Sequence, residues 1–271
     1  MNQLTWLRAK RIVAGLSLAV LLTLSPAVRV AAKGAEKEPP SAKRVAIVID
    51  DFGNDMSGTP EMMAAPIKLT VAIMPFLQST KRDAEWAHRL GHDVIVHLPM
   101  EPLRGRKAWL GPGAIMTDLT DDEIRSRVEA AIDEVPYAVG INNHMGSKAT
   151  ADERVMRIVL EVCKKRGLFF LDSKTNYRSV VGKIGAELGV PVIKNELFLD
   201  DVASSAQILR QLQLAQKYAN EHETCVAIGH VGISGKKTAA VIHNSAPGMT
   251  KDIQFVRLSE LVEPMKPIAS K

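Results

Sequence analysis

Short apolar runs recur along the chain, and most of them stop at a polar or ionisable residue. The first run, residues 45–49, reads VAIVI and is followed at once by Asp50 and Asp51. An uninterrupted apolar run is typical of a strand that is covered on both faces, as in the parallel sheets of α/β proteins. The pattern therefore predicts a buried strand that ends at two adjacent carboxylates.

Similar runs predict more strands, at residues 69–74, 94–97, 137–141, 168–171, 225–228 and 253–256, with another at either 192–193 or 197–199. Amphipathic segments between the runs predict helices, at residues 60–65, 80–91, 120–135, 150–167, 179–188, 203–220 and 238–244. Two helices begin with a capping box, Thr120 with Glu123 and Thr150 with Glu153. A β-α rhythm repeated about seven times favours an α/β fold of the distorted (β/α)7–8 barrel type over an open doubly wound sheet.

One connection in this pattern is unusually long. Residues 101–119 are rich in Gly and Pro and contain Arg104, Arg106, Lys107 and Trp109. Loops of this length without regular structure are usually lids or binding rims. We expect this loop to border a functional site.

The N-terminal segment has the features of a secretory signal. Arg8, Lys10 and Arg11 precede an apolar stretch, residues 12–24, that is broken by Pro26 and followed by small residues, with possible cleavage triplets at 25–27 and 30–32. The apolar stretch is short for a membrane span, which needs roughly 20 residues. We predict a signal at residues 1–32, a linker at 33–43, one domain at 44–271, and export to the periplasm or cell envelope. An uncleaved membrane anchor stays open as the alternative.

Charge and cysteine content narrow the function classes. The formal net charge is +5, but residues 1–32 hold four basic residues and no acid, so the rest carries only +1 and offers no basic patch for nucleic acid. Residues after the first strand contain no Gly-rich phosphate loop, which argues against a nucleotide site. Export would permit a disulfide between Cys163 and Cys225, but their apolar neighbours favour two buried thiols.

Polar side chains end five of the predicted strands. They are Asp50 and Asp51, His97, Asn143 and His144, Asp172, and His230. A single histidine at a strand end is more often a hydrogen-bonded core residue than a ligand. However, the carboxyl ends of barrel strands share one rim, so these side chains are expected to converge. Carboxylate and imidazole ligands with an open position suit a hydrolytic zinc or similar divalent site.

Several motifs resemble those of a known superfamily. The Asp-Asp pair after the first strand, the segment GHDVIVH at 91–97 and the Ile-Gly-His at 228–230 resemble the polysaccharide deacetylase superfamily (carbohydrate esterase family 4). The segments IDDFG, HLPMEP, NNHMGS, FLDS and IGHVG are similar to its divergent bacterial branch, over roughly residues 44–261. The resemblance implies a barrel that removes acetyl groups from an envelope glycan with Zn²⁺ or another divalent cation.

The resemblance also implies roles for individual residues. Asp50 would be the general base, His230 the general acid, and Asp51 and His97 metal ligands. The superfamily's third ligand, a histidine four residues after His97, is replaced here by a glutamate.

We assign the third ligand to His144, whose strand ends on the same rim, with Glu101 as the reserve. The Arg-x-Pro-Tyr motif of the superfamily is absent, and backbone N–H groups near Met145 and Gly146 are candidates to replace its oxyanion site. Asp172 is expected either to orient a ligand or to satisfy a turn. Asp200 and Asp201 are expected to cap the next helix.

Two other functions fit the sequence. The departures at Glu101 and at the missing arginine motif suit a non-catalytic envelope protein that keeps the metal and binds glycan or a partner protein. A metal phosphoesterase also fits clusters of Asp and His but lacks ligands for a second metal. The leading hypothesis remains a deacetylase acting on an acetylated glycan, in contact with the membrane only through an uncleaved signal. The oligomeric state is not determined by the sequence.

Overall fold

The computed structural model describes residues 42–262, so the predicted signal and most of the predicted linker lie outside the described residues. Nine strands in this part of the chain form one sheet in which every pair is parallel. The strands are β1 Arg44–Phe52, β2 Thr70–Ile73, β3 Asp93–Met100, β4 Ala138–Met145, β5 Phe169–Asp172, β6 Val192–Lys194, β7 Leu197–Phe198, β8 Thr224–His230 and β9 Gln254–Val256.

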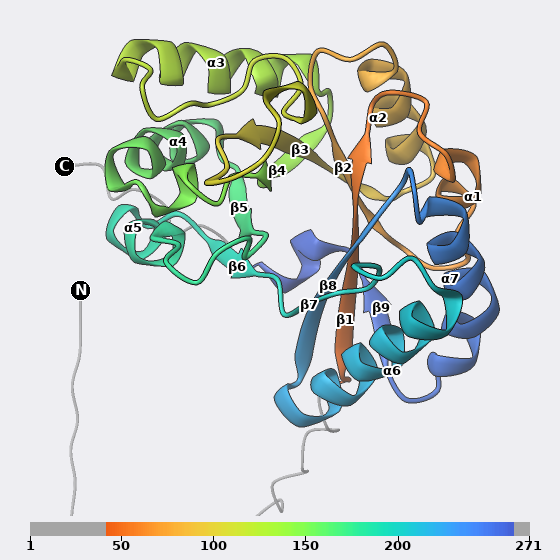
Figure 1. Cartoon of the computed structure of the whole chain (residues 1–271). Helices are drawn as coiled ribbons and strands as arrows, with labels where there is room; N and C mark the ends of the chain where they lie inside the picture. The colour runs from red at the N-terminus through yellow and green to blue at the C-terminus, as the bar shows by residue number, and fades with distance from the viewer. Residues whose placement is uncertain (1–41, 263–271) are drawn as a thin grey trace, which may run out of the picture. The chain divides into compact units, whose positions relative to one another are not determined.

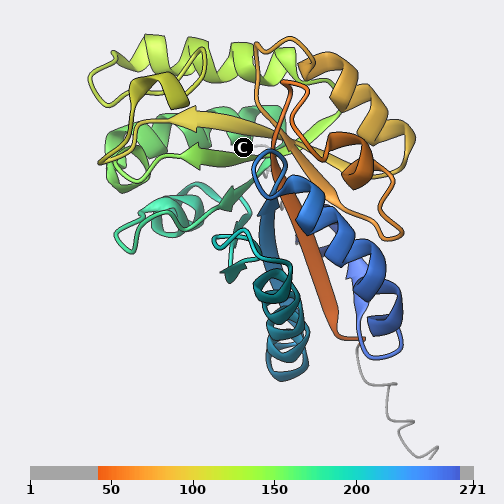
Figure 2. The same ribbon diagram turned by 45° about the vertical axis from the view of Figure 1, so that its right-hand side comes forward.

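The sheet is curled, and helices cover its outer face (Figures 1 and 2). The strand order is β6-β5-β4-β3-β2-β1-β8-β7, and β9 pairs with the start of β1. Between residues 42 and 262 no ladder joins β6 to β7, so the barrel is open at that seam. The helices are α1 Thr59–Met63, α2 Thr80–Arg89, α3 Asp121–Glu134, α4 Glu153–Arg166, α5 Val181–Leu188, α6 Ser205–His222 and α7 Gly235–Met249. The predicted distorted (β/α) barrel is confirmed.

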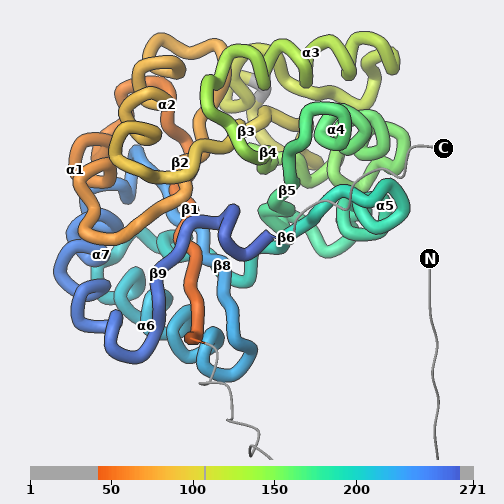
Figure 3. The backbone as a smooth tube through the Cα atoms, turned by 180° about the vertical axis from the view of Figure 1, so that it is seen from behind, coloured from red at the N-terminus to blue at the C-terminus, as the bar shows by residue number. Residues whose placement is uncertain are grey.

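The last described residues close the curl at the amino ends of its strands. Figure 3 shows β9 beside β1, although about 200 residues of chain separate them. The short 3-10 helix η3, Leu258–Leu261, follows β9, and its Leu258 is buried among the inner side chains of the strands. The open end of the curl is therefore the one at the carboxyl ends of the strands.

The packing of β1 explains why its sequence is apolar without interruption. Ala46 and Val48 belong to the hydrophobic cluster inside the curl, whereas Val45, Ile47 and Ile49 pack in the larger cluster between sheet and helices. All five are fully buried, and each Val or Ile side chain buried in this way stabilises the fold by about 1.5–3 kcal/mol. Both faces of β1 are covered, as the apolar run predicted.

Several element boundaries differ from the expectation. Both alternatives for the strand near residue 195 exist, as β6 and β7. Strands β3 and β4 run on to Met100 and Met145, so His97 and His144 lie inside strands rather than after them. The last helix is also longer than predicted and includes Pro247.

One of the two predicted capping boxes is wrong. Thr120 and Glu123 form theirs as expected. In the other case α4 begins only at Glu153, so Asp152 stands at the N-cap and its carboxylate accepts from the Val155 N–H. Thr150 lies in the short 3-10 helix η2, Ala149–Ala151, and its hydroxyl donates to the Gly146 carbonyl. Asp152, the residue directly before the helix, therefore caps α4 in place of Thr150.

Two further observations concern the described part of the chain. Cys163 and Cys225 are both free and buried, in agreement with the interpretation as two thiols. Among residues 42–262 no helix combines the length and the apolar character needed to cross a membrane.

Candidate metal centre

The inner face of the curl changes from apolar to polar towards its open end. Side chains of a strand alternate between the two faces, so residues two apart share a face. Ala46 and Val48 lie inside the curl, and Asp50 is next in that row. The same step leads from Ile95 to His97 in β3 and from Ile228 to His230 in β8. Alternation therefore places these three polar side chains at one end of the interior.

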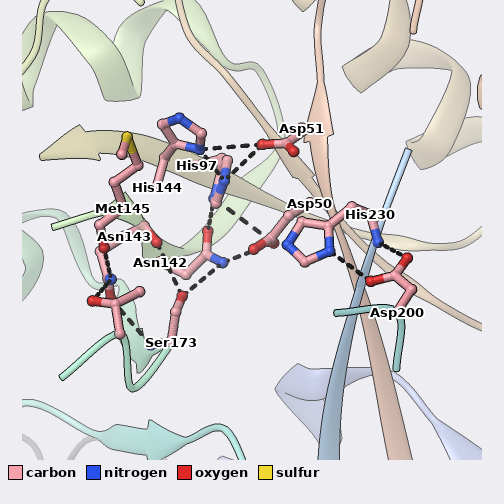
Figure 4. A network of polar contacts seen from close by, with 11 residues as sticks. Asp50, Asp51, His97, Asn142, Asn143, His144, Met145, Ser173, Asp200 and His230 are labelled. Carbon is pink, nitrogen blue, oxygen red and sulfur yellow. Dashed lines mark hydrogen bonds and ion pairs between the residues drawn. The ribbon is translucent and has the colours of Figure 1, made fainter. Parts of the chain in front are cut away.

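Asp51 is the exception, since alternation alone would turn it outwards. The pairing of β1 with β2 shifts between Ile49 and Phe52, and Asp51 has a left-handed φ of 71°. Such a conformation costs a non-Gly residue about 1–3 kcal/mol, and residues held in it cluster at functional sites. It turns the Asp51 side chain inwards, so that two consecutive carboxylates both face His97 (Figure 4).

Three potential ligand atoms meet at this point. The Asp51 carboxylate oxygen Oδ1 lies 3.3 Å from His97 Nε2 and 3.2 Å from His144 Nδ1, and the two ring nitrogens are 3.0 Å apart. Ligands of a tetrahedral zinc ion with bonds of about 2.0–2.1 Å are about 3.3 Å from one another. The spacing of Asp51, His97 and His144 thus fits a single small divalent ion.

The hydrogen bonds behind the rings determine which nitrogens carry protons. Asn142 is fully buried; its Nδ2 donates to Asp50 Oδ1 at 2.9 Å, which leaves its Oδ1 as the acceptor for His97 Nδ1 at 2.8 Å. His144 Nε2 donates in the same way to the Trp109 carbonyl at 3.0 Å. A carbonyl oxygen can only accept, so each neutral ring presents its unprotonated nitrogen to Asp51.

This arrangement leaves three acceptor atoms facing one another. Three acceptors with no donor between them repel unless a cation lies among them. Ligating histidines usually donate their second ring N–H to an amide, carbonyl or carboxylate, as both rings do here. The oxygen of Asp51 and the two ring nitrogens therefore fit a divalent cation as its ligands.

Glu101, the reserve ligand, has other partners. Its Oε2 accepts from the Thr117 N–H and hydroxyl, both at 2.7 Å, and its Oε1 accepts from Lys148 Nζ at 2.8 Å. The side chain ties the loop of residues 101–119 to the segment after β4. The structure thus brings His144, and not Glu101, to Asp51 and His97.

The predicted base and acid lie beside this cluster (Figure 4). Asp50 is 2 % exposed, and burial raises its pKa. His230 donates from Nδ1 to Asp200 Oδ1 at 2.7 Å. Burial alone would lower the pKa of His230, but the hydrogen bond to Asp200 and the charge of Asp50 raise it to about 9.

Asp200 is not a helix cap, and that prediction was wrong. The next helix, α6, begins at Ser205 and has Ser204 at its N-cap. The Asp200 carboxylate instead accepts from the backbone N–H and ring of His230, from Ser234 and from Thr238. It has this position because β7 pairs with β8, which puts the end of one strand beside that of the other. Asp201 is exposed.

Asp172 satisfies a turn, the second of its two expected roles. Its carboxylate accepts from the Lys174 N–H and from the Ser179 hydroxyl.

The sequence reasoning missed Asn142, although alternation could have found it, since residue 142 shares a face with His144. It also missed the role of Asp200, for which only the strand pairing gives a signal.

Comparisons with known proteins agree with this fold. The model of the divergent polysaccharide deacetylase family matches residues 47–262, so the chain belongs to that family. It is 36% identical over 224 residues to the uncharacterized protein YibQ of Escherichia coli, covering 83% of this chain and 69% of YibQ. It is 35% identical over 228 residues to an uncharacterized protein of Haemophilus influenzae, covering 84% of this chain and 80% of that protein.

Two solved structures share the architecture. Protein ATU2773 of Agrobacterium tumefaciens superposes with a TM-score of 0.76 at 24% identity, covering 82% of this chain and 89% of that one. The Bc1960 peptidoglycan N-acetylglucosamine deacetylase superposes with a TM-score of 0.51 at 15% identity, covering 84% and 92%. At these identities the similarity establishes the deacetylase-type barrel.

Proposed function

We propose that this protein is a metal-dependent hydrolase that removes acetyl groups from an acetylated glycan of the cell envelope. The observation that carries the proposal is the set of three facing acceptors on Asp51, His97 and His144, with Asp50 on one side of it. Family membership and the fold shared with a peptidoglycan N-acetylglucosamine deacetylase support the substrate class. Export, with the signal at residues 1–32, is part of the proposal.

Asp51, His97 and His144 would hold Zn²⁺ or another divalent cation. A cation there would polarise the acetyl carbonyl and lower the pKa of water to about 7. Asp50 would take the proton of the attacking water, and the Asn142 amide would hold the carboxylate in place for this step. With a pKa of about 9, His230 is protonated near neutral pH and would give its proton to the leaving amine or hydroxyl of the glycan. The products are acetate and the deacetylated sugar.

The test combines a metal measurement with an activity measurement. Purified protein should contain about one divalent ion per chain and release acetate from N-acetylated chitooligosaccharides or peptidoglycan fragments. Asp50→Asn should retain the metal and lose acetate release by at least about 100-fold, the lower range for a general base. One bound metal without turnover on any glycan would reject catalysis and favour a metal-retaining binding protein.

A pair of variants tests the ligand set. His144→Ala should lose the metal, whereas Glu101→Ala should keep it, because the Glu101 carboxylate is already bound by Thr117 and Lys148. The reverse result would show that the third ligand is Glu101.

A further inference from the structure

A hollow of about 400 Å³ lies among the loops at the carboxyl ends of the strands, the rim that also carries the metal centre. Its walls come from the loops after β3, β4 and β5, which are adjacent strands of the sheet. Two of these strands carry His97 and His144. The hollow therefore lies on the same rim as the metal centre, although none of the proposed ligands or catalytic groups lines it.

Hydrogen bonds between the three loops hold the hollow in shape. The Leu103 N–H donates to the Ser147 hydroxyl at 2.9 Å, and the Asn176 side chain donates to the Thr150 hydroxyl at 2.7 Å. Lys148 and Glu101 form an ion pair between the first two loops. A site that exists before the ligand arrives loses less entropy on binding.

Two exposed aromatic residues stand on the loops to either side of β4. Trp109, after β3, is 61 % exposed, and Tyr177, after β5, is 86 % exposed. Each has an arginine over its ring: the Arg106 guanidinium carbon lies 5.7 Å from the Trp109 ring centre, and that of Arg178 lies 5.5 Å from the Tyr177 ring centre. The C–H face of a sugar ring packs well on an exposed aromatic ring, so Trp109 and Tyr177 each offer a stacking face for a glycan.

The charge of this rim is positive. Among the ion pairs formed by residues 42–262, none involves Arg104, Arg106 or Arg178. Of the acids on these loops, Glu101 pairs with Lys148, whereas Asp118 and Asp152 form no ion pair within residues 42–262, so the free arginines outnumber the free carboxylates by three to two. Arginine without a partner is well suited to bind a carboxylate. Because the chain after residue 32 has a net charge of only +1, this concentration of positive charge is local.

We propose that the centre acts on an acidic glycan, in which sugars next to the acetylated one carry carboxylates. The Arg106–Trp109 and Arg178–Tyr177 pairs would each bind one neighbouring sugar, the ring against the aromatic face and the carboxylate against the guanidinium. The inference rests on the proposed function for the acetyl group that reacts. It adds that a neutral acetylated glycan is the poorer substrate.

Two acetylated hexasaccharides test the inference by calorimetric titration. One alternates N-acetylglucosamine with glucuronate, and the other is chitohexaose, which is neutral. Every protein also carries Asp50→Asn, so that no acetyl group is removed during the titration. We expect the acidic hexasaccharide to bind at least about tenfold more tightly at low ionic strength, with the difference shrinking as salt rises to about 0.2 M.

Matched variants assign the preference to the two arginines. The double variant Arg106→Gln and Arg178→Gln should reduce the ratio of the two affinities to about one. Arg89→Gln removes the same kind of charge at the end of α2, next to the start of β3, and should leave the ratio unchanged. Tyr177→Leu should weaken the binding of both hexasaccharides, because it removes a stacking face and no charge.

The outcomes separate the inference from the proposed function. Equal binding of the two hexasaccharides, or a preference that survives the double arginine variant, would overturn the inference. Binding of hexaglutamate as tight as that of the acidic hexasaccharide would also overturn it, in favour of an acidic protein partner. If wild-type protein fails to release acetate while the preference holds, the proposed function fails and the acidic-glycan site remains. Acetate release without a preference for the acidic hexasaccharide would support the proposed function and overturn the inference.

Discussion

Replacement of Asn142 by leucine tests the central hydrogen bonds of the site. The two side chains are nearly equal in size, so the change removes little volume but three hydrogen bonds, the longest of which runs to the Ser173 hydroxyl at 3.4 Å. Asp50 loses the donor at 2.9 Å, and the buried His97 Nδ1–H loses its acceptor at 2.8 Å. A hydrogen bond to a charged group contributes about 1.5–3 kcal/mol, and a buried N–H without a partner costs about 1–3 kcal/mol.

The expected consequence is a loss of metal affinity. Without Asn142 no hydrogen bond holds the His97 proton on Nδ1, so the ring is free to carry it on Nε2, the nitrogen that faces Asp51. Removing such a supporting partner typically weakens metal binding about 10–100-fold. Competition with a coloured chelator measures the affinity, and NMR of the histidine ring nitrogens reports the tautomer of His97.

A neighbouring residue provides the control. Asn143 is equally buried, but its side chain bonds to the Met145 carbonyl and the Ser173 N–H and does not touch His97. Asn143→Leu should lower the stability of the fold while changing metal affinity less than about threefold. If Asn142→Leu binds metal as tightly as the wild type, or His97 keeps its tautomer, Asn142 does not position the ligand.

Two further predictions concern pH and metal removal. Since the pKa of His230 is raised to about 9, the acid form is present at neutral pH, and activity should fall as pH rises through about 9. In Asp200→Asn this fall should begin at lower pH, and an unshifted pH–rate profile would contradict the role of Asp200. The same raised pKa means that the pair stabilises the fold below about pH 6.5 and that this stabilisation is lost as pH rises through about 9. Chelation should lower the melting temperature: a metal at about 1,000 times its Kd contributes about 4 kcal/mol, or roughly 8–16 °C for a domain of this size. Asp51→Asn should melt at the same temperature with and without chelator, and a chelator effect in that variant would exclude Asp51 as a ligand.

The sequence by itself determined the parts of the fold that depend on local pattern. The apolar run of residues 45–49 specified a strand buried on both faces, and the polar residues at the strand ends indicated that Asp50, His97, His144 and His230 share one rim. These features follow from residues that are close together in the chain, because strand geometry fixes which side chains share a face.

Only the tertiary structure decided which polar groups meet. The left-handed backbone at Asp51, the bridge from Asn142 to both Asp50 and His97, and the pairing that brings Asp200 to His230 all join distant segments. The Glu101 carboxylate is also able to bind a metal, yet the packing of its loop places it against Thr117 and Lys148. A residue type states what a side chain can bind, whereas long-range strand pairing and loop packing select its partner.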